Sequence, residues 1–146
     1  MPFATTVKIR WADIDPAGVV YYPRFLHYCH TAMEEFFEHA LALPYPKLTQ
    51  EHRLGFPAVH LDVDFRNPLR YGDTVGVAVT IAKLGKTSVD WRFTLTRNDG
   101  VLSAEARVVT ACLDLDAFRA RELPEWLREL LGAPQHGIEP GEHRPA

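Results

Sequence analysis

Residues 23–43 read PRFLHYCHTAMEEFFEHALAL, and this stretch carries the clearest periodic signal in the chain. Its apolar residues recur at steps of three and four, namely at Phe25, Tyr28, Cys29, Ala32, Met33, Phe36, Phe37, Ala40 and Leu41. That spacing places them on one face of an α-helix, whereas polar residues such as Glu34 and Glu38 fall on the other. Pro23 suits the first helical position and Pro44 opposes continuation, so we expect one amphipathic helix of about 28 Å.

On both sides of this helix the pattern changes to the two-residue alternation that is typical of β-strands. One strand is expected at 7–11, and four more follow near 59–65, 75–81, 89–95 and 102–113. Turn signals lie between the last four, at Tyr71-Gly72-Asp73, Gly85-Lys86 and Asn98-Asp99-Gly100, and we expect each to close a hairpin. This order predicts an α+β fold in which a mainly antiparallel five-stranded sheet wraps one long helix.

The chain has 146 residues, of which 47% are hydrophobic, and this fits one globular domain. We expect that domain to span 1–131, with a short helix at 124–131, and the Pro- and Gly-containing stretch 132–146 to be a flexible tail. The formal net charge of −3 gives no nucleic-acid-binding surface. No secretory h-region and no segment long enough to cross a bilayer is present, which predicts a soluble cytoplasmic protein without membrane partners.

The two cysteines, Cys29 and Cys112, both lie in apolar-periodic segments. Neither belongs to a C-x-x-C or another metal-ligand spacing. We therefore expect two buried, reduced thiols and no metal site.

Between the first expected strand and the helix stands Asp13-Ile14-Asp15-Pro16-Ala17-Gly18-Val19-Val20-Tyr21-Tyr22-Pro23. These residues do not fit an EF-hand calcium loop, because the twelfth position of that loop would be Arg24, where a bidentate Glu is needed. A purely structural role remains open, since an Asp side chain before a turn commonly caps its own backbone. A catalytic role is the other alternative.

The start of the helix supports the catalytic hypothesis, because free backbone N–H groups and the positive end of the helix dipole follow Asp15 within a few residues. A carbonyl oxygen that gains negative charge is stabilised in such a place. Gly18 allows the backbone to approach a ligand closely, and we expect Gly18 and Val19 to contact substrate. Acyl transfer requires at least a nucleophile or base and a group that stabilises the oxyanion, and a carboxylate beside a helix terminus provides both.

The run from Asp13 to Pro23, followed by a long amphipathic helix, resembles the hotdog-fold acyl-CoA thioesterases and in particular the 4-hydroxybenzoyl-CoA thioesterase branch. The stretch Asp64-Phe65-Arg66-Asn67-Pro68-Leu69-Arg70-Tyr71-Gly72-Asp73 is similar to the strand and turn after the helix in that superfamily. The resemblance implies a hotdog fold and hydrolysis of an aromatic (benzoyl-type) or short-chain acyl-CoA without any cofactor. It also implies a homodimer or homotetramer whose active sites lie at subunit interfaces.

Position by position, the resemblance makes Asp15 the catalytic carboxylate, acting as nucleophile or general base. It makes the backbone N–H of Tyr22 the group that polarises the thioester oxygen. The resemblance places His30 where the 4-hydroxybenzoyl branch has an Asp that binds the substrate phenol. Because an imidazole reads a hydroxyl differently, the identity of the acyl group stays open. Lys86 stands near the position expected for the phosphates of coenzyme A.

Two further hypotheses remain beside the thioesterase. One is a non-catalytic hotdog module that binds acyl-CoA or serves in assembly, although such a module has no need of Asp15. The other is a hotdog dehydratase or hydratase. Those enzymes use a histidine in the loop that enters the helix, and residues 13–23 contain none.

Overall fold

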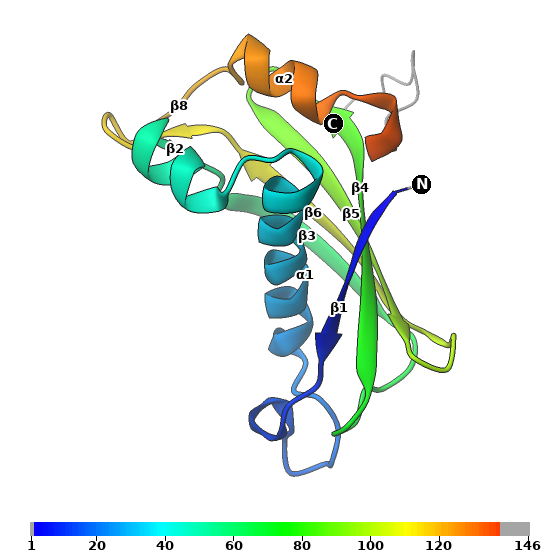
Figure 1. Cartoon of the computed structure of the whole chain (residues 1–146). Coiled ribbons are helices and arrows are strands. Elements are labelled where there is room, and N and C mark those ends of the chain that lie inside the picture. The colour runs from blue at the N-terminus through cyan, green and yellow to red at the C-terminus, as the bar shows by residue number, and fades with distance from the viewer. Residues whose placement is uncertain (1, 138–146) are drawn as a thin grey trace.

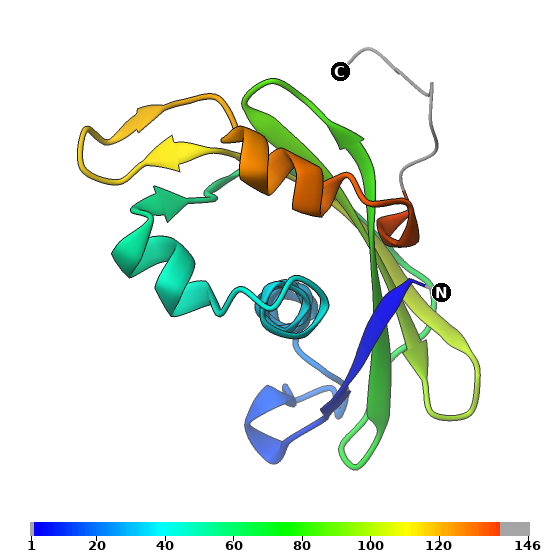
Figure 2. The same ribbon diagram turned by 45° about the horizontal axis from the view of Figure 1, so that its top comes forward.

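The structure, a computed structural model, describes residues 2–137. Its main sheet has five antiparallel strands in the order β1 (Phe3–Lys8), β4 (Thr74–Leu84), β5 (Ser88–Arg97), β6 (Leu102–Ala111) and β3 (Ala58–Phe65). This sheet curls around the long helix, which is seen nearly end-on in Figure 2. The α+β hotdog architecture expected from the sequence is therefore confirmed (Figure 1).

The long helix has two parts. The α-helix α1 (Pro23–Glu35) continues directly into a π-helical turn, η2 (Phe36–Ala40), in which the N–H of Leu41 donates to the carbonyl oxygen of Phe36. The wider turn lets the adjacent residues Phe36 and Phe37 both bury their rings completely. A π turn within a helix is uncommon and holds one residue more than an α turn.

The core lies between α1 and the concave face of the sheet. As the alternation predicts, every second residue of the two central strands is buried, namely Val75, Val77, Val79, Ile81, Val89, Trp91, Phe93 and Leu95. Trp91 stands at the centre, with its ring centroid 5.4 Å from that of Phe36 and 5.8 Å from that of Phe37. These contacts fix the helix axis against the middle of the sheet.

Two of the strand predictions are wrong. β1 ends at Lys8, and Trp11 lies in a 3-10 turn, η1 (Trp11–Asp13), with 72% of its surface exposed. β3 forms no hairpin with β4. Instead it crosses to the far edge of the sheet and pairs with β6. The turn at Tyr71-Gly72-Asp73 exists, but it follows a long connection, because a turn signal fixes a change of direction and not the partner of a strand.

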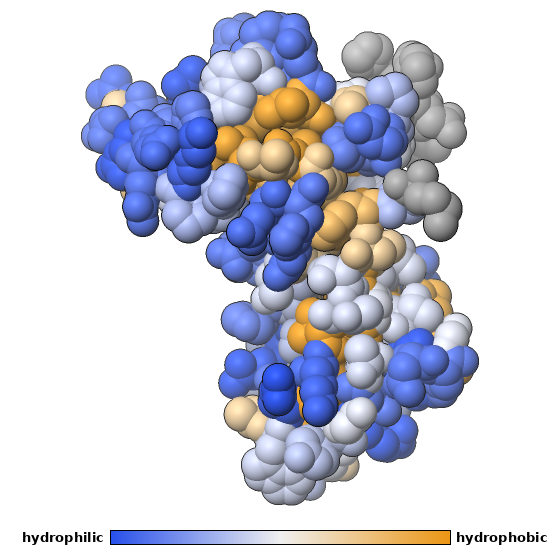
Figure 3. All heavy atoms as spheres, viewed as in Figure 1, coloured by the Kyte–Doolittle hydropathy of each residue, from blue (hydrophilic) through white to orange (hydrophobic). Residues whose placement is uncertain are grey.

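A small second sheet lies beside the main one and was not predicted. It joins β2 (Leu54–Gly55), β7 (Leu113–Asp114) and β8 (Arg119–Ala120), and it is flanked by the π turn η3 (Lys47–Glu51) and helix α2 (Glu125–Leu131). This part projects from the body of the molecule and is mostly hydrophilic on the face shown in Figure 3. Among the described residues, no helix combines the length and apolar content that a membrane span requires.

Residues after α2 fold back onto the core. The 3-10 turn η4 (Pro134–His136) buries the imidazole of His136, whose centroid lies 4.9 Å from that of Phe36. Residues 132–137 were expected to belong to the flexible tail, and here they are packed. The rest of that expected tail, 138–146, lies outside the described residues, and the domain limits stay a prediction.

The burial of His136 makes the stability of the protein depend on pH. Burial lowers the pKa of this imidazole below its ordinary value. Below the unfolded pKa of about 6.5, the unfolded chain therefore binds a proton that the folded chain resists, so stability falls as the pH drops toward the folded pKa. We expect the fall in Tm between pH 7.5 and pH 5 to be smaller in His136→Gln than in the wild type. Equal falls in the two proteins would contradict this.

Candidate active site

The loop that enters α1 is a tight, doubly closed turn. The N–H of Tyr21 donates to the carbonyl oxygen of Asp13 at 2.8 Å, and the N–H of Asp15 donates to that of Val19 at 3.0 Å. Within it, the N–H of Gly18 donates to the carbonyl oxygen of Asp15, and Gly18 has a φ of +82° that favours glycine. A Cβ at this position would meet no atom within 4 Å, so the backbone angle and not crowding requires the glycine.

The two carboxylates of this turn have different surroundings. Asp13 is 7% exposed, its Oδ2 accepts the backbone N–H of Arg10 at 2.9 Å, and its Oδ1 lies 3.6 Å from Nε of Arg24. The hydroxyl of Tyr28 faces this carboxylate without meeting hydrogen-bond geometry to any acceptor in residues 2–137. Burial, together with Asp13, raises the pKa of Tyr28. Asp13 therefore holds the turn in place.

Asp15 keeps one oxygen free. Its Oδ1 accepts the backbone N–H of Ala17 at 2.8 Å, which is the capping contact that a purely structural role predicts. In the part of the chain that the structure describes, no donor meets its Oδ2. The side chain is only partly buried, so a ligand has access to it. The capping contact thus leaves the other oxygen of the same carboxylate open to a ligand.

Two backbone N–H groups that follow Asp15 in the chain are unpaired within the described residues. Among residues 2–137, the backbone N–H groups of Val19 and Tyr22 meet no acceptor. Tyr22 immediately precedes Pro23, the first residue of α1, so its N–H lies at the positive end of the helix dipole. A carbonyl oxygen placed there accepts a hydrogen bond in a field that favours negative charge.

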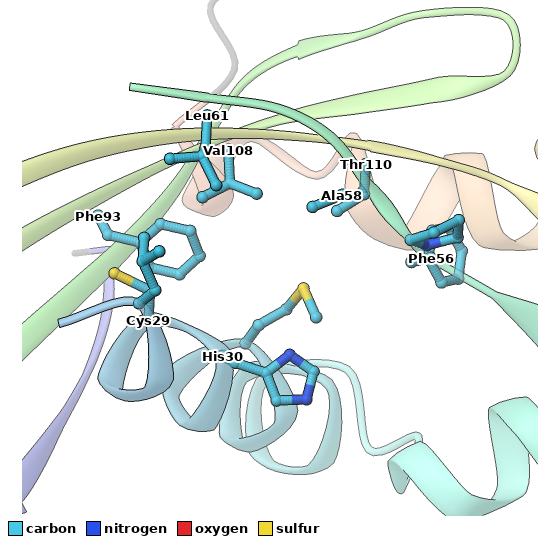
Figure 4. Close-up of a pocket in the computed structure, with 11 residues that line it drawn as sticks. Cys29, His30, Phe56, Ala58, Leu61, Phe93, Val108 and Thr110 are labelled. Atoms are coloured by element: carbon cyan, nitrogen blue, oxygen red, sulfur yellow. The ribbon is translucent and has the colours of Figure 1, made fainter. Parts of the chain in front are cut away.

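A cavity of about 290 Å³ opens along the same face of α1. The helix contributes Leu26, Cys29, His30 and Met33, and the sheet side contributes Phe56, Pro57, Ala58, Leu61, Phe93, Val108 and Thr110. Figure 4 shows the helix residues and the strand residues on opposite sides of this space. Leu26 follows Tyr22 by one helical turn, roughly 6 Å along the axis, so the cavity begins close to the free N–H group.

His30 stands at the rim of the cavity. Its side chain is 54% exposed, and its Nε2 lies 3.7 Å from a carboxylate oxygen of Glu34, one turn further along α1. The ring of Tyr45 lies edge-to-face at 6.2 Å between centroids. His30 therefore lines the cavity, and its contact with substrate stays a prediction.

Comparison with known proteins agrees with this geometry. Residues 9–131 match the family model described as the thioesterase-like superfamily. The chain belongs to this superfamily.

Three relatives show how far the likeness extends. A 1,4-dihydroxy-2-naphthoyl-CoA hydrolase from Nostoc punctiforme is 30% identical over 144 residues, which cover 99% of this chain and 96% of that protein. The acyl-CoA thioesterase YbgC from Haemophilus influenzae is 28% identical, with 84% of this chain and 89% of that protein covered. The structure of a 1,4-dihydroxy-2-naphthoyl-CoA thioesterase from Synechocystis is 26% identical with a TM-score of 0.82, and covers 93% and 99%. The chain is thus a thioester hydrolase, as its turn motif predicts.

Lys86 lies far from the carboxylate of this thioesterase within one protomer. Lys8 pairs with Thr74 at the start of β4, so the Asp15 turn is at that end of the strand, whereas Lys86 follows the other end. Eleven strand residues separate the two ends by roughly 35 Å. The ammonium of Lys86 is 3.2 Å from a carboxylate oxygen of Glu122. The structure therefore does not bring Lys86 and Asp15 together in a single chain.

Cys29 is the only cysteine among the cavity residues that the structure describes. Burial raises the pKa of its thiol to about 12, so it remains protonated at neutral pH. Cys112 is buried as well, and both cysteines are free, as expected. We assign no chemistry to either thiol.

The sequence signals for the cavity were weak. Leu26, Cys29 and Met33 follow the three- and four-residue spacing of a helix face, which does not distinguish a pocket wall from a core. Thr110 is the only polar side chain among the inward-facing residues of β6 from Ala104 onward, and that position is a signal that sequence analysis missed.

Proposed function

We propose that this thioesterase hydrolyses aromatic acyl-CoA substrates, with Asp15 as the catalytic carboxylate and the Tyr22 N–H as the oxyanion donor. The observation that carries this proposal is that one Asp15 oxygen in the closed turn and the N–H of Tyr22 just after that turn are both unengaged within residues 2–137. An apolar cavity begins one helical turn beyond Tyr22, at Leu26. Carboxylate, oxyanion donor and acyl pocket are the three parts that the reaction needs.

The chemistry follows from these groups. With the thioester oxygen on the Tyr22 N–H, the carbonyl carbon becomes more electrophilic. Asp15 then either attacks this carbon, releases the CoA thiolate and leaves an anhydride for water to cleave, or removes a proton from the attacking water. Both routes consume one water molecule and end in free acid and CoA.

The character of the cavity supports an aromatic acyl group over a short aliphatic one. Phe56 and Phe93 present rings to a space whose other walls are mostly aliphatic side chains and the Cys29 and Met33 sulfurs. Aromatic rings pack well on such walls through edge and face contacts. The relatives named for a dihydroxynaphthoyl thioester are consistent with this class.

We further propose that the active enzyme is at least a homodimer, joined along β3. This strand is at the edge of the sheet, and three of its apolar side chains are exposed: Val59 by 63%, Leu61 by 46% and Phe65 by 51%. An exposed apolar edge strand invites pairing with another strand. A second copy of this chain would pair with the free backbone groups of β3 and bury its exposed apolar side chains. It would also place another protomer beside the cavity.

Kinetics with a panel of CoA esters test the substrate class. Purified protein is offered benzoyl-, hydroxybenzoyl-, 1,4-dihydroxy-2-naphthoyl-, phenylacetyl- and short aliphatic CoA thioesters while thiol release is followed. We expect kcat/KM for the best aromatic ester to exceed that for acetyl-CoA by about 100-fold, because an acetyl group leaves most of the apolar pocket unfilled. Equal values for aromatic and aliphatic esters would overturn the aromatic assignment.

A further inference from the structure

The acyl cavity contains one buried polar group that the reaction does not use. Its walls are apolar apart from the imidazole of His30 at the rim, the protonated thiol of Cys29 and the hydroxyl of Thr110. Thr110 is 2% exposed and lies on the sheet side, across the space from His30 in Figure 4. A buried hydroxyl in such a wall needs hydrogen-bond partners.

Among residues 2–137, this hydroxyl has one hydrogen-bond partner. The indole Nε1–H of Trp91 donates to Oγ1 of Thr110 at 3.0 Å, and Trp91 is completely buried. Because an indole N–H only donates, the Thr110 oxygen is the acceptor and its own hydrogen must point elsewhere. Within residues 2–137, no acceptor for that hydrogen is found. A buried donor left without an acceptor costs about 1–3 kcal/mol.

We infer that Thr110 is a specificity-determining residue, whose hydroxyl donates a hydrogen bond to an oxygen substituent on the ring of the acyl group. The Trp91 indole fixes the position of the Thr110 oxygen, and the apolar walls hold the aromatic ring of the acyl group. The preferred substrates are then aryl-CoA thioesters that carry a ring hydroxyl. This inference rests on the proposed function and narrows its substrate class.

Selectivity follows from the cost of an unpaired donor. A ring without an oxygen substituent fills the same space but leaves the Thr110 hydrogen facing carbon. A site built around a hydrogen bond rejects the analogue that lacks the partner group more strongly than an apolar pocket rejects a poor fit. His30, at the rim, is partly exposed and can be hydrated, so it imposes a smaller penalty.

The test compares Thr110→Val with Thr110→Ser on matched ester pairs. The pairs are benzoyl- against each hydroxybenzoyl-CoA, and 2-naphthoyl- against 1,4-dihydroxy-2-naphthoyl-CoA. In the wild type we expect the best hydroxylated ester to exceed its unsubstituted analogue in kcat/KM by about tenfold or more, the equivalent of one hydrogen bond. Thr110→Val should abolish this preference, because it lowers kcat/KM for the hydroxylated ester and relieves the penalty on its unsubstituted analogue, and Thr110→Ser should retain it.

Each outcome has one meaning. Equal loss on both esters in Thr110→Val, or an unchanged preference, overturns the role of Thr110 and indicates that water satisfies its hydroxyl. Thermal unfolding checks that the variants fold, and Thr110→Ala replaces the valine variant if the latter does not. A wild-type protein that hydrolyses no aryl-CoA ester overturns the proposed function itself, which is a different result from hydrolysis without hydroxyl preference.

Discussion

Replacing Asp15 by Asn is expected to lower kcat by roughly 10³-fold or more, since the reaction loses its nucleophile or general base. The Asn side chain retains an oxygen in the place of Oδ1, so it still accepts the Ala17 N–H and the turn keeps its shape. Tm should therefore remain close to the wild-type value. Steady-state kinetics with the best CoA ester of the panel, and thermal unfolding of the same sample, provide the two measurements.

A second substitution separates catalysis from capping. Asp15→Ala removes the capping oxygen as well, so it should lose activity to a similar extent and also unfold at a lower temperature. Asp116→Asn is the matched control, because this carboxylate is 71% exposed and pairs with Arg53 on the surface. If Asp15→Asn turns over within a few-fold of the wild type, the carboxylate serves only the turn and the catalytic assignment fails.

Proline at position 63 is expected to separate the protomers and to abolish most of the activity. The N–H of Arg66 donates to the carbonyl oxygen of Ser103 on the β6 side. Since such bonds recur at every second residue of an antiparallel ladder, the N–H of Val63 faces the free edge of β3. Val63→Pro therefore removes an edge donor without breaking the ladder to β6. A misplaced partner at the site should cost roughly 10²-fold in kcat/KM.

Light scattering at micromolar protein concentration measures the assembly, and the ester assay measures the activity of the same sample. Val63→Ala shortens the side chain but keeps the N–H, so it should stay assembled and active. Val59→Lys, which adds charge to the same exposed edge, provides an independent variant if the proline chain does not fold. A monomeric variant with full activity would show that one chain suffices, and a fully assembled Val63→Pro would exclude β3 as the interface.

Periodicity predicted the elements of this fold better than their pairing. The helix after Pro23 and the central strands with Trp91 follow directly from spacing, because each buries one face and leaves a regular pattern. The hairpins at Gly85 and Gly100 are local and were found. The placement of β3 beside β6 depends on residues about 45 positions apart, and no local signal records such a choice.

The candidate site was predictable in its turn and not in its pocket. Residue chemistry alone left Asp13 and Asp15 equivalent, and family resemblance chose Asp15. The burial of Asp13 against the Arg10 N–H gives the physical reason for the difference, since only Asp15 retains an accessible oxygen. Thr110 was missed because the meaning of a polar residue on an inward strand position depends on the indole behind it.

The π-helical turn η2 has a consequence for how this chain tolerates changes in length. The helix residues that line the cavity, from Leu26 to Met33, all lie before it, whereas Phe36 and Phe37 within it belong to the core. A turn that already accommodates one additional residue can return to α-helical geometry if one residue is deleted there. Such a deletion would change the helix register only after the turn, toward Leu41, and would leave the register before the turn unchanged. The two ends of the helix can therefore change independently in evolution.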